Sequence, residues 1–169
     1  MVYGVCDDSN AIRSMSVVVP TAVSDDPAPR LAALWHAVAT RMVDLPIYNP
    51  KLTVQTTEFR RHGRWTVGVA VTPWFMNVVA IPDDPAAVPL PGASVTIDLP
   101  GGKIEAIVCD FDGFGRLACA SLFSPMDAFD DPAVTGITAL AAFDALFGLK
   151  DEPASPLDRR RLFFGTASR

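Results

Sequence analysis

Residues 64–82, RWTVGVAVTPWFMNVVAIP, carry the strongest indication of the fold, because two apolar runs flank a break at Pro73. In the first run the side chains alternate, with Trp65, Val67, Val69 and Val71 on one side and Thr66, Gly68, Ala70 and Thr72 on the other. Such alternation is typical of a β-strand. Pro73 lacks a backbone N–H and interrupts strand pairing. Directly after it come Trp74, Phe75 and Met76. The stretch predicts two strands joined at a corner.

Further strand patterns lie on both sides of this corner. Residues 51–60 mix threonine and valine, and three alternating runs follow at residues 93–99, 104–109 and 116–123. Short turn signals rich in glycine and aspartate separate the last three runs, as in β-hairpins. The spacing predicts an antiparallel β-meander of about six strands, each close to the usual length.

Two helices are predicted outside the strands, and each has one apolar side. The first has apolar residues at helical spacing and ends before Pro46; they are Leu31, Leu34, Trp35, Val38 and Met42. The second begins at Asp131 and Pro132 and ends at Gly148, and its apolar residues are Val134, Ile137, Leu140, Ala141, Phe143 and Phe147. Two amphipathic helices packed on one face of an antiparallel sheet would bury both apolar surfaces. The predicted fold class is therefore α+β.

The length of 169 residues suits one domain with a sizeable core. Residues 1–30 mix serine, proline and single charges, which predicts a poorly ordered N-terminal extension. The domain is expected to cover residues 31–165, and residues 166–169 form a short C-terminal tail. The N-terminus lacks the charged and apolar regions of an export signal, so we expect none there.

Composition excludes several classes of partner and site. The net charge of −5 argues against binding to nucleic acid backbones. The mean hydropathy is +0.27, but no apolar run approaches the roughly 20 residues of a membrane span, so we expect no membrane embedding. The three cysteines, Cys6, Cys109 and Cys119, include no C-x-x-C pair, which argues against a disulfide framework or zinc site and favours a cytoplasmic location. The oligomeric state is not predicted.

The search for an active site, a metal site or a cofactor site finds none. Asp110 and Asp112 begin like a calcium loop, but Phe114 and Ser121 stand where oxygen ligands are required. No glycine-rich phosphate-binding motif occurs. An enzyme that uses Asp110 or Cys119 remains one alternative.

The corner and several later segments together resemble a known family. The pattern W-T-x-G-x-x-x-T-P-W around residues 65–74 is similar to the signature of the HybE/HupJ family of nickel-iron hydrogenase assembly chaperones. Five further landmarks occur in the family's order, at residues 42–46, 48–50, 99–102, 122–126 and 159–165. The resemblance implies a non-enzymatic cytoplasmic chaperone. Its expected client is the hydrogenase small-subunit precursor with its twin-arginine signal, the large subunit being a second candidate.

We predict that apolar residues at the corner and in the loop of residues 110–115 bind this client. The candidate partner-binding residues are Trp74, Phe75, Met76, Phe111, Phe114, Arg159, Arg160 and Arg161. Aromatic and methionine side chains would adapt to varied apolar segments, and the arginines would meet carboxylates of the partner. Burial of the aromatic residues in the core is the competing interpretation, because tryptophan and phenylalanine are usually buried. A small-ligand-binding or lipid-binding module, with the same apolar residues around a closed cavity, is the alternative function.

Overall fold

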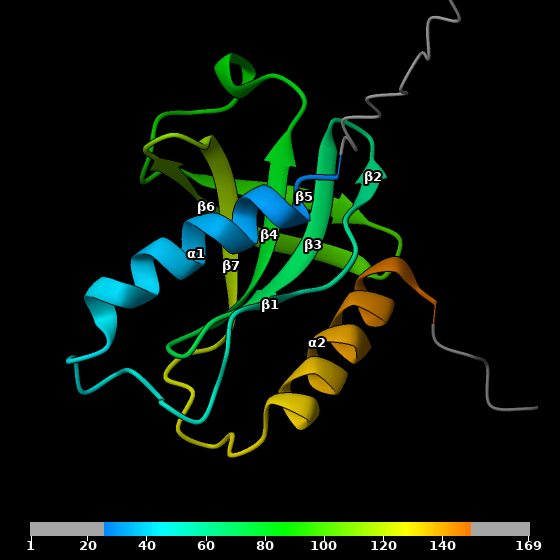
Figure 1. Cartoon of the computed structure of the whole chain (residues 1–169). Coiled ribbons are helices and arrows are strands. Elements are labelled where there is room, and N and C mark those ends of the chain that lie inside the picture. Colours follow the sequence, from blue (N-terminus) through cyan, green and yellow to red (C-terminus); the bar gives the residue numbers. More distant parts are fainter. Residues whose placement is uncertain (1–25, 150–169) are drawn as a thin grey trace, which may run out of the picture.

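A computed structural model describes residues 26–149 as one antiparallel sheet with two α-helices (Figure 1). The helices are α1 (Ala28–Met42) and α2 (Pro132–Phe147), with a short 3₁₀ helix η1 (Pro85–Ala87). The strands are β1 (Gln55–Thr56), β2 (Arg60–His62), β3 (Trp65–Val71), β4 (Met76–Pro82), β5 (Ser94–Leu99), β6 (Gly102–Phe111) and β7 (Gly115–Phe123). The α+β class and the antiparallel sheet are confirmed.

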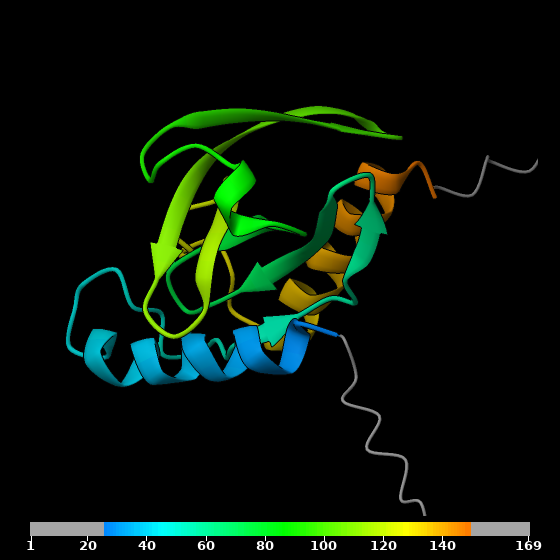
Figure 2. The ribbon, with the colours of Figure 1, turned by 90° about the horizontal axis from the view of Figure 1, so that it is seen from above.

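The sheet order differs from a simple meander at one step. The order is β1-β3-β4-β7-β6-β5, with β2 also paired to β3. The hairpins β3–β4, β5–β6 and β6–β7 form as expected, but β4 pairs with β7. The proline-rich connection after β4 contains η1 and carries the chain to the far edge of the sheet, where β5 begins (Figure 2). As a result β4 is a central strand between β3 and β7 (Figure 1).

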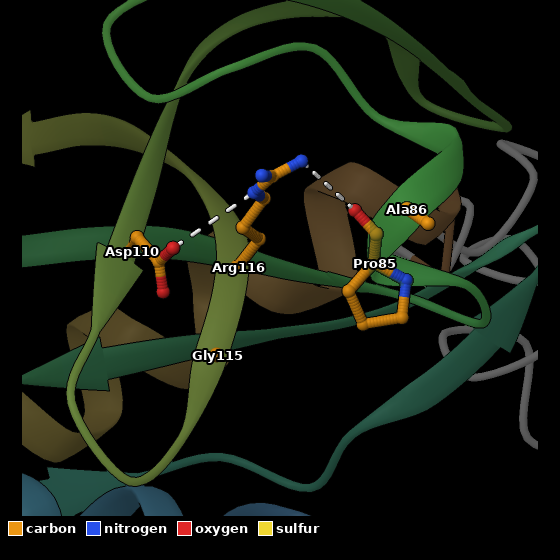
Figure 3. Close-up of a pocket in the computed structure, with 5 residues that line it drawn as sticks. All are labelled: Pro85, Ala86, Asp110, Gly115 and Arg116. Carbon is orange, nitrogen blue, oxygen red and sulfur yellow. Dashed lines mark hydrogen bonds and ion pairs between the residues drawn. The ribbon is translucent and has the colours of Figure 1, made fainter.

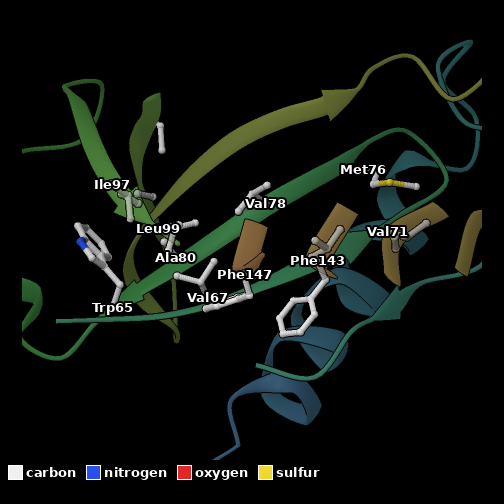
Figure 4. Packing of buried hydrophobic residues seen from close by; sticks show 14 of the residues in the cluster. Trp65, Val67, Val71, Met76, Val78, Ala80, Ile97, Leu99, Phe143 and Phe147 are labelled. Atoms are coloured by element: carbon white, nitrogen blue, oxygen red, sulfur yellow. The ribbon is translucent and has the colours of Figure 1, made fainter. Parts of the chain in front are cut away.

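The two helices cover opposite faces of the sheet, so the expectation that both pack on one face is wrong. On one face, Phe143 and Phe147 of α2 pack against alternate residues of the strands (Figure 4). On the other face, Leu31 and Trp35 of α1 pack against the intervening residues. The strand members of the first set include Val67, Val69, Val71, Met76, Val78 and Ala80, and those of the second include Ala70, Val79 and Leu117.

Small residues explain why the second face of β3 is buried rather than wet. Gly68 and Ala70 are both fully covered, although neither has a large side chain. A Cβ at Gly68 would lie 2.9 Å from ring atoms of Phe59, so the aromatic ring packs directly on the backbone. Because residues 68 and 70 are small, the covering side chains pack closely against this face of β3. Larger polar residues at these two positions would instead face water.

Local hydrogen bonds and a left-handed glycine stabilise the predicted corner and the two ends of α2. At the corner, the Thr72 side-chain oxygen accepts hydrogen bonds from the backbone N–H groups of Trp74 and Phe75, at 3.3 and 3.0 Å. At the start of α2, the Asp131 side chain accepts from the backbone N–H of Ala133 at 2.8 Å. Gly148 ends the helix in the left-handed conformation, with φ of 66°.

The described region leaves several predicted features untested. The first 25 residues of the expected extension, the expected tail and Arg159, Arg160 and Arg161 lie outside it. Within it, neither helix combines the length and apolarity that crossing a bilayer requires.

Candidate functional site

The structure buries two of the predicted corner residues. Trp74 is 6% exposed and Met76 is fully buried. They also point to opposite faces of the sheet, since Trp74 packs in the α1 layer and Met76 in the α2 layer. The prediction that both belong to one exposed apolar surface is therefore wrong. The reason is that β4 lies between β3 and β7, with a helix over each of its faces.

The same geometry argues against the closed-cavity alternative in the form in which it was predicted. A cavity lined by Trp74 and Met76 together would have to pass through the sheet that separates them. The two side chains instead fill two different cores.

An aromatic layer lies between α1 and the sheet, and it contains the other predicted aromatic residues, Phe75, Phe111 and Phe114. Trp35 makes edge-to-face contacts with Phe75 and Phe111, at ring-centroid distances of 5.2 and 4.9 Å. Trp74 contacts Phe75 at 5.7 Å and stacks on Tyr48 at 6.1 Å. Phe75 and Phe111 are only partly buried, so the edge of this layer reaches the surface. Aromatic pairs in such geometry also hold one another rigidly.

A surface groove opens between α1 and the β6–β7 loop. We call it the α1–loop groove; it is lined by Arg30, Ala33, Leu34, Asp112, Gly113 and Phe114 and has a volume of about 290 Å³. The guanidinium carbon of Arg30 lies 5.0 Å from the centre of the Phe114 ring, a cation–π contact. The groove thus combines apolar walls with one cation and one exposed carboxylate, that of Asp112.

A second hollow lies between the same hairpin and η1 (Figure 3). It has a volume of about 370 Å³ and is lined by Pro85, Ala86, Asp110, Gly115 and Arg116. The Arg116 side chain spans it, with Nε 3.8 Å from an Asp110 carboxylate oxygen and Nη1 3.5 Å from the carbonyl oxygen of Pro85. Because the Arg116 side chain already interacts with Asp110 and Pro85, it is less available to bind a partner than the exposed carboxylate of Asp112 in the α1–loop groove.

The two groups that the enzyme alternative would use, Asp110 and Cys119, each interact with a neighbouring side chain. Cys109 and Cys119 lie on adjacent strands, close enough for hydrogen bonding between their thiols to shift the pKa of both. This interaction lowers the pKa of Cys109 to about 7 and, together with burial, raises the pKa of Cys119 far above its ordinary value. Cys119 therefore stays a neutral thiol at neutral pH, and the other candidate, Asp110, faces Arg116. Between residues 26 and 149, no group of three or more side chains is placed to hold a metal ion.

The sequence predicts only one side of the groove. Phe114 is among the predicted binding residues, whereas the sequence pattern places Arg30 in the expected extension and Leu34 in the core. Arg30 and Leu34 are four residues apart, a spacing that places them on the same side of a helix. That spacing is the signal that points to a shared surface, although it does not show which loop lies opposite.

Comparisons with known proteins agree with this fold. The family model described as "[NiFe]-hydrogenase assembly, chaperone, HybE" matches residues 26–165. Hydrogenase expression/formation protein HupJ of Bradyrhizobium diazoefficiens is 41% identical over 146 residues, which cover 80% of this chain and 86% of that protein. Hydrogenase expression/formation protein HupT of Azotobacter chroococcum is 38% identical over 136 residues, covering 79% and 91%. The solution structure of HybE from Escherichia coli covers 85% of this chain and 91% of its own, with a TM-score of 0.58 and 22% identity, which shows a shared fold.

Proposed function

This chain belongs to the HybE family of [NiFe]-hydrogenase assembly chaperones, and we propose that it holds hydrogenase precursor subunits without catalysing a reaction. The observation that carries the proposal is the match of the family model over residues 26–165. The relatives are named for hydrogenase expression and formation, which fits a role in assembly.

The client that we propose is the small-subunit precursor, held through its twin-arginine signal in the cytoplasm before export. Such a segment places cationic side chains next to apolar ones. The α1–loop groove has matching chemistry, since Asp112 supplies a carboxylate and Leu34 and Phe114 supply apolar walls. The net charge of −5 would also attract a cationic segment over longer distances. The large subunit is the second candidate client.

The aromatic layer would support this groove from beneath. Phe111 and Phe75 reach the surface edge of the layer, and Trp74 and Met76 anchor the strand break in the two cores. In this arrangement Trp74 and Met76 act on the client through the residues that they hold in place. Arg159, Arg160 and Arg161 are proposed as a second contact, with carboxylates of the client.

The size of the groove suits reversible binding. About 290 Å³ is at the lower end of the range for ligand pockets, enough for one or two side chains. Burial of one large apolar side chain contributes about 1.5–3 kcal/mol. A few such contacts give moderate affinity, which allows the client to leave when assembly is complete.

Capture from cells that co-express the chain with one hydrogenase precursor at a time tests the proposal. The tagged full chain should retain the small-subunit precursor, and Phe114→Ser and Asp112→Asn should each lower the retained amount several-fold. Leu90→Ser is the matched control, because Leu90 is 70% exposed and does not line the groove. If both groove variants retain the precursor as well as the unmodified chain does, the groove is the wrong site. If the unmodified chain retains neither precursor, the proposed client is wrong.

A further inference from the structure

The side of α2 that faces away from the sheet is apolar and uncovered by any described residue. Ile137 is 68% exposed, Val134 is 52% exposed and Leu140 is 51% exposed. Helical spacing places Val134 and Ile137 on the side of α2 away from Ala139 and Phe143, which pack into the core, and Leu140 at the edge of that side. We call this surface the outer face of α2. Figure 1 shows the strands of the sheet on one side of α2.

This exposure is unusual for a helix of a folded domain. A surface helix normally carries charged or polar residues opposite its buried stripe, whereas a helix that is apolar all round is covered on both sides. In α2 the only charged residue is Asp144. Three large apolar side chains in one row form the kind of patch that is normally covered by something.

Asp144 lies at the end of the same outer face. It is four residues after Leu140 and seven after Ile137, so all three share one side of the helix. No arginine or lysine among residues 26–149 forms an ion pair with its carboxylate. The outer face thus presents a row of apolar side chains followed by one carboxylate toward the C-terminal end.

The chain itself contains a complementary sequence shortly after α2. The described region ends at Leu149, next to the C-terminal cap of α2. Residues 159–164 are Arg-Arg-Arg-Leu-Phe-Phe, three cations followed by three large apolar residues. The family model extends through residue 165, so this segment belongs to the family's domain.

We propose that Leu162, Phe163 and Phe164 dock on the outer face of α2, with one of the preceding arginines paired to Asp144. The order of residues matches a segment that runs back along the helix. It meets Asp144 first with its arginines and then Leu140, Ile137 and Val134 with its apolar residues. The remaining arginines face outward, which leaves them available to a partner.

The connecting length is sufficient for this path. Val134 lies 15 residues before Leu149, or about 22 Å along the helix axis. The 15 residue steps from Leu149 to Phe164, the residue that would meet Val134, extend to about 50–54 Å at most, and a flexible chain of that length has a root-mean-square span of about 21 Å. A tethered segment of matching span reaches its site at high effective concentration. This favours the chain's own segment over a second copy or a client as the occupant.

Photo-cross-linking of the full chain identifies the occupant directly. With p-benzoylphenylalanine at position 137, we expect an intramolecular cross-link that peptide mass spectrometry maps to residues 159–165. The matched control carries the same group at Ile107, which is 45% exposed on β6 and should give no such product. Cross-links to a second copy or to a hydrogenase subunit, or the absence of any product with residues 159–165, would overturn the proposal.

Limited trypsin digestion supplies an independent readout. Docking should slow cleavage after Arg159, Arg160 and Arg161 in the full chain, and Ile137→Asp should accelerate it about tenfold because the apolar segment would have to bury a charged carboxylate. Asp144→Asn should accelerate it less, and Leu90→Asp not at all. Circular dichroism confirms that each variant is folded. Equal cleavage rates in the unmodified chain and in Ile137→Asp would refute docking.

Discussion

The contact between the β5–β6 turn and α2 provides the sharpest test of the tertiary packing. Gly101 in this turn donates its backbone N–H to the carbonyl oxygen of Leu146 at 2.8 Å. An added Cβ at Gly101 would lie 1.8 Å from the carbonyl oxygen of Ala145 and 2.9 Å from two backbone carbons of α2. Because these are backbone atoms of a helix, they cannot rotate away as a side chain would. We therefore expect Gly101→Ala to push the turn and α2 apart.

The energetic cost follows from what must move. Contacts of a real Cβ are essentially never shorter than 3.0 Å, but the added Cβ would lie 1.8 Å from the carbonyl oxygen of Ala145. The turn and α2 must therefore move apart by at least about 1.2 Å. Overpacking of this kind costs about 1–3 kcal/mol, and loss of the hydrogen bond adds about 1 kcal/mol. We expect the free energy of unfolding to fall by about 2–4 kcal/mol. For a chain of this size, that lowers the melting temperature by roughly 5–15 °C.

Urea denaturation followed by far-UV circular dichroism measures the loss. The matched control is Gly102→Ala, one residue further along the same turn. Gly102 has φ of 137°, but no atom lies within 4 Å of its added Cβ, so only backbone strain of about 1–2 kcal/mol is expected. If Gly101→Ala is as stable as the unmodified chain, or loses no more than Gly102→Ala, the packing of α2 against this turn is wrong.

Three further predictions concern the cysteines, the two cores and the start of α2. Alkylation of Cys109, followed by mass spectrometry, should have a midpoint near pH 7, since the thiolate reacts and the pKa is lowered to about 7. Cys119→Ala removes the hydrogen bond that lowers this pKa and should move the midpoint upward; an unchanged midpoint would contradict that cause. Phe143→Ala and Leu31→Ala should lower the free energy of unfolding by about 3–5 and 2–5 kcal/mol, and the losses should add in the double variant because the residues pack on opposite faces. A marked shortfall from additivity in urea titrations would argue against two separate layers. Asp131→Ala should cost about 1 kcal/mol in the same assay, as expected for loss of a helix cap, and Asp131→Asn should retain most of the stability.

Much of the candidate site could be anticipated from sequence, but its exposure could not. The aromatic residues Phe111 and Phe114 were recognised in the loop, and both lie at or beside the α1–loop groove. Trp74 was expected at the surface and is buried, because the residues after Pro73 enter a strand with neighbours on both sides. Arg30 lines the groove only because α1 crosses the sheet next to the β6–β7 loop.

Local patterns in the sequence specify the helices and strands of this protein. Period-two alternation and turn residues specify the strands, apolar spacing and capping residues specify α1 and α2, and the ordered motifs around residues 65–74 indicated the family. These signals are local, since each depends on backbone preferences and on which side chains share a side of one element.

Which surfaces meet depends on contacts between distant parts of the chain and could not be read from local patterns. The pairing of β4 with β7, the placement of α1 and α2 on opposite faces and the contact of Gly101 with α2 all join residues far apart in the chain. Periodicity predicts that a side chain will be buried, but it does not predict which element will pack against it. That element is determined by the path of the connections and by the close packing of all layers together.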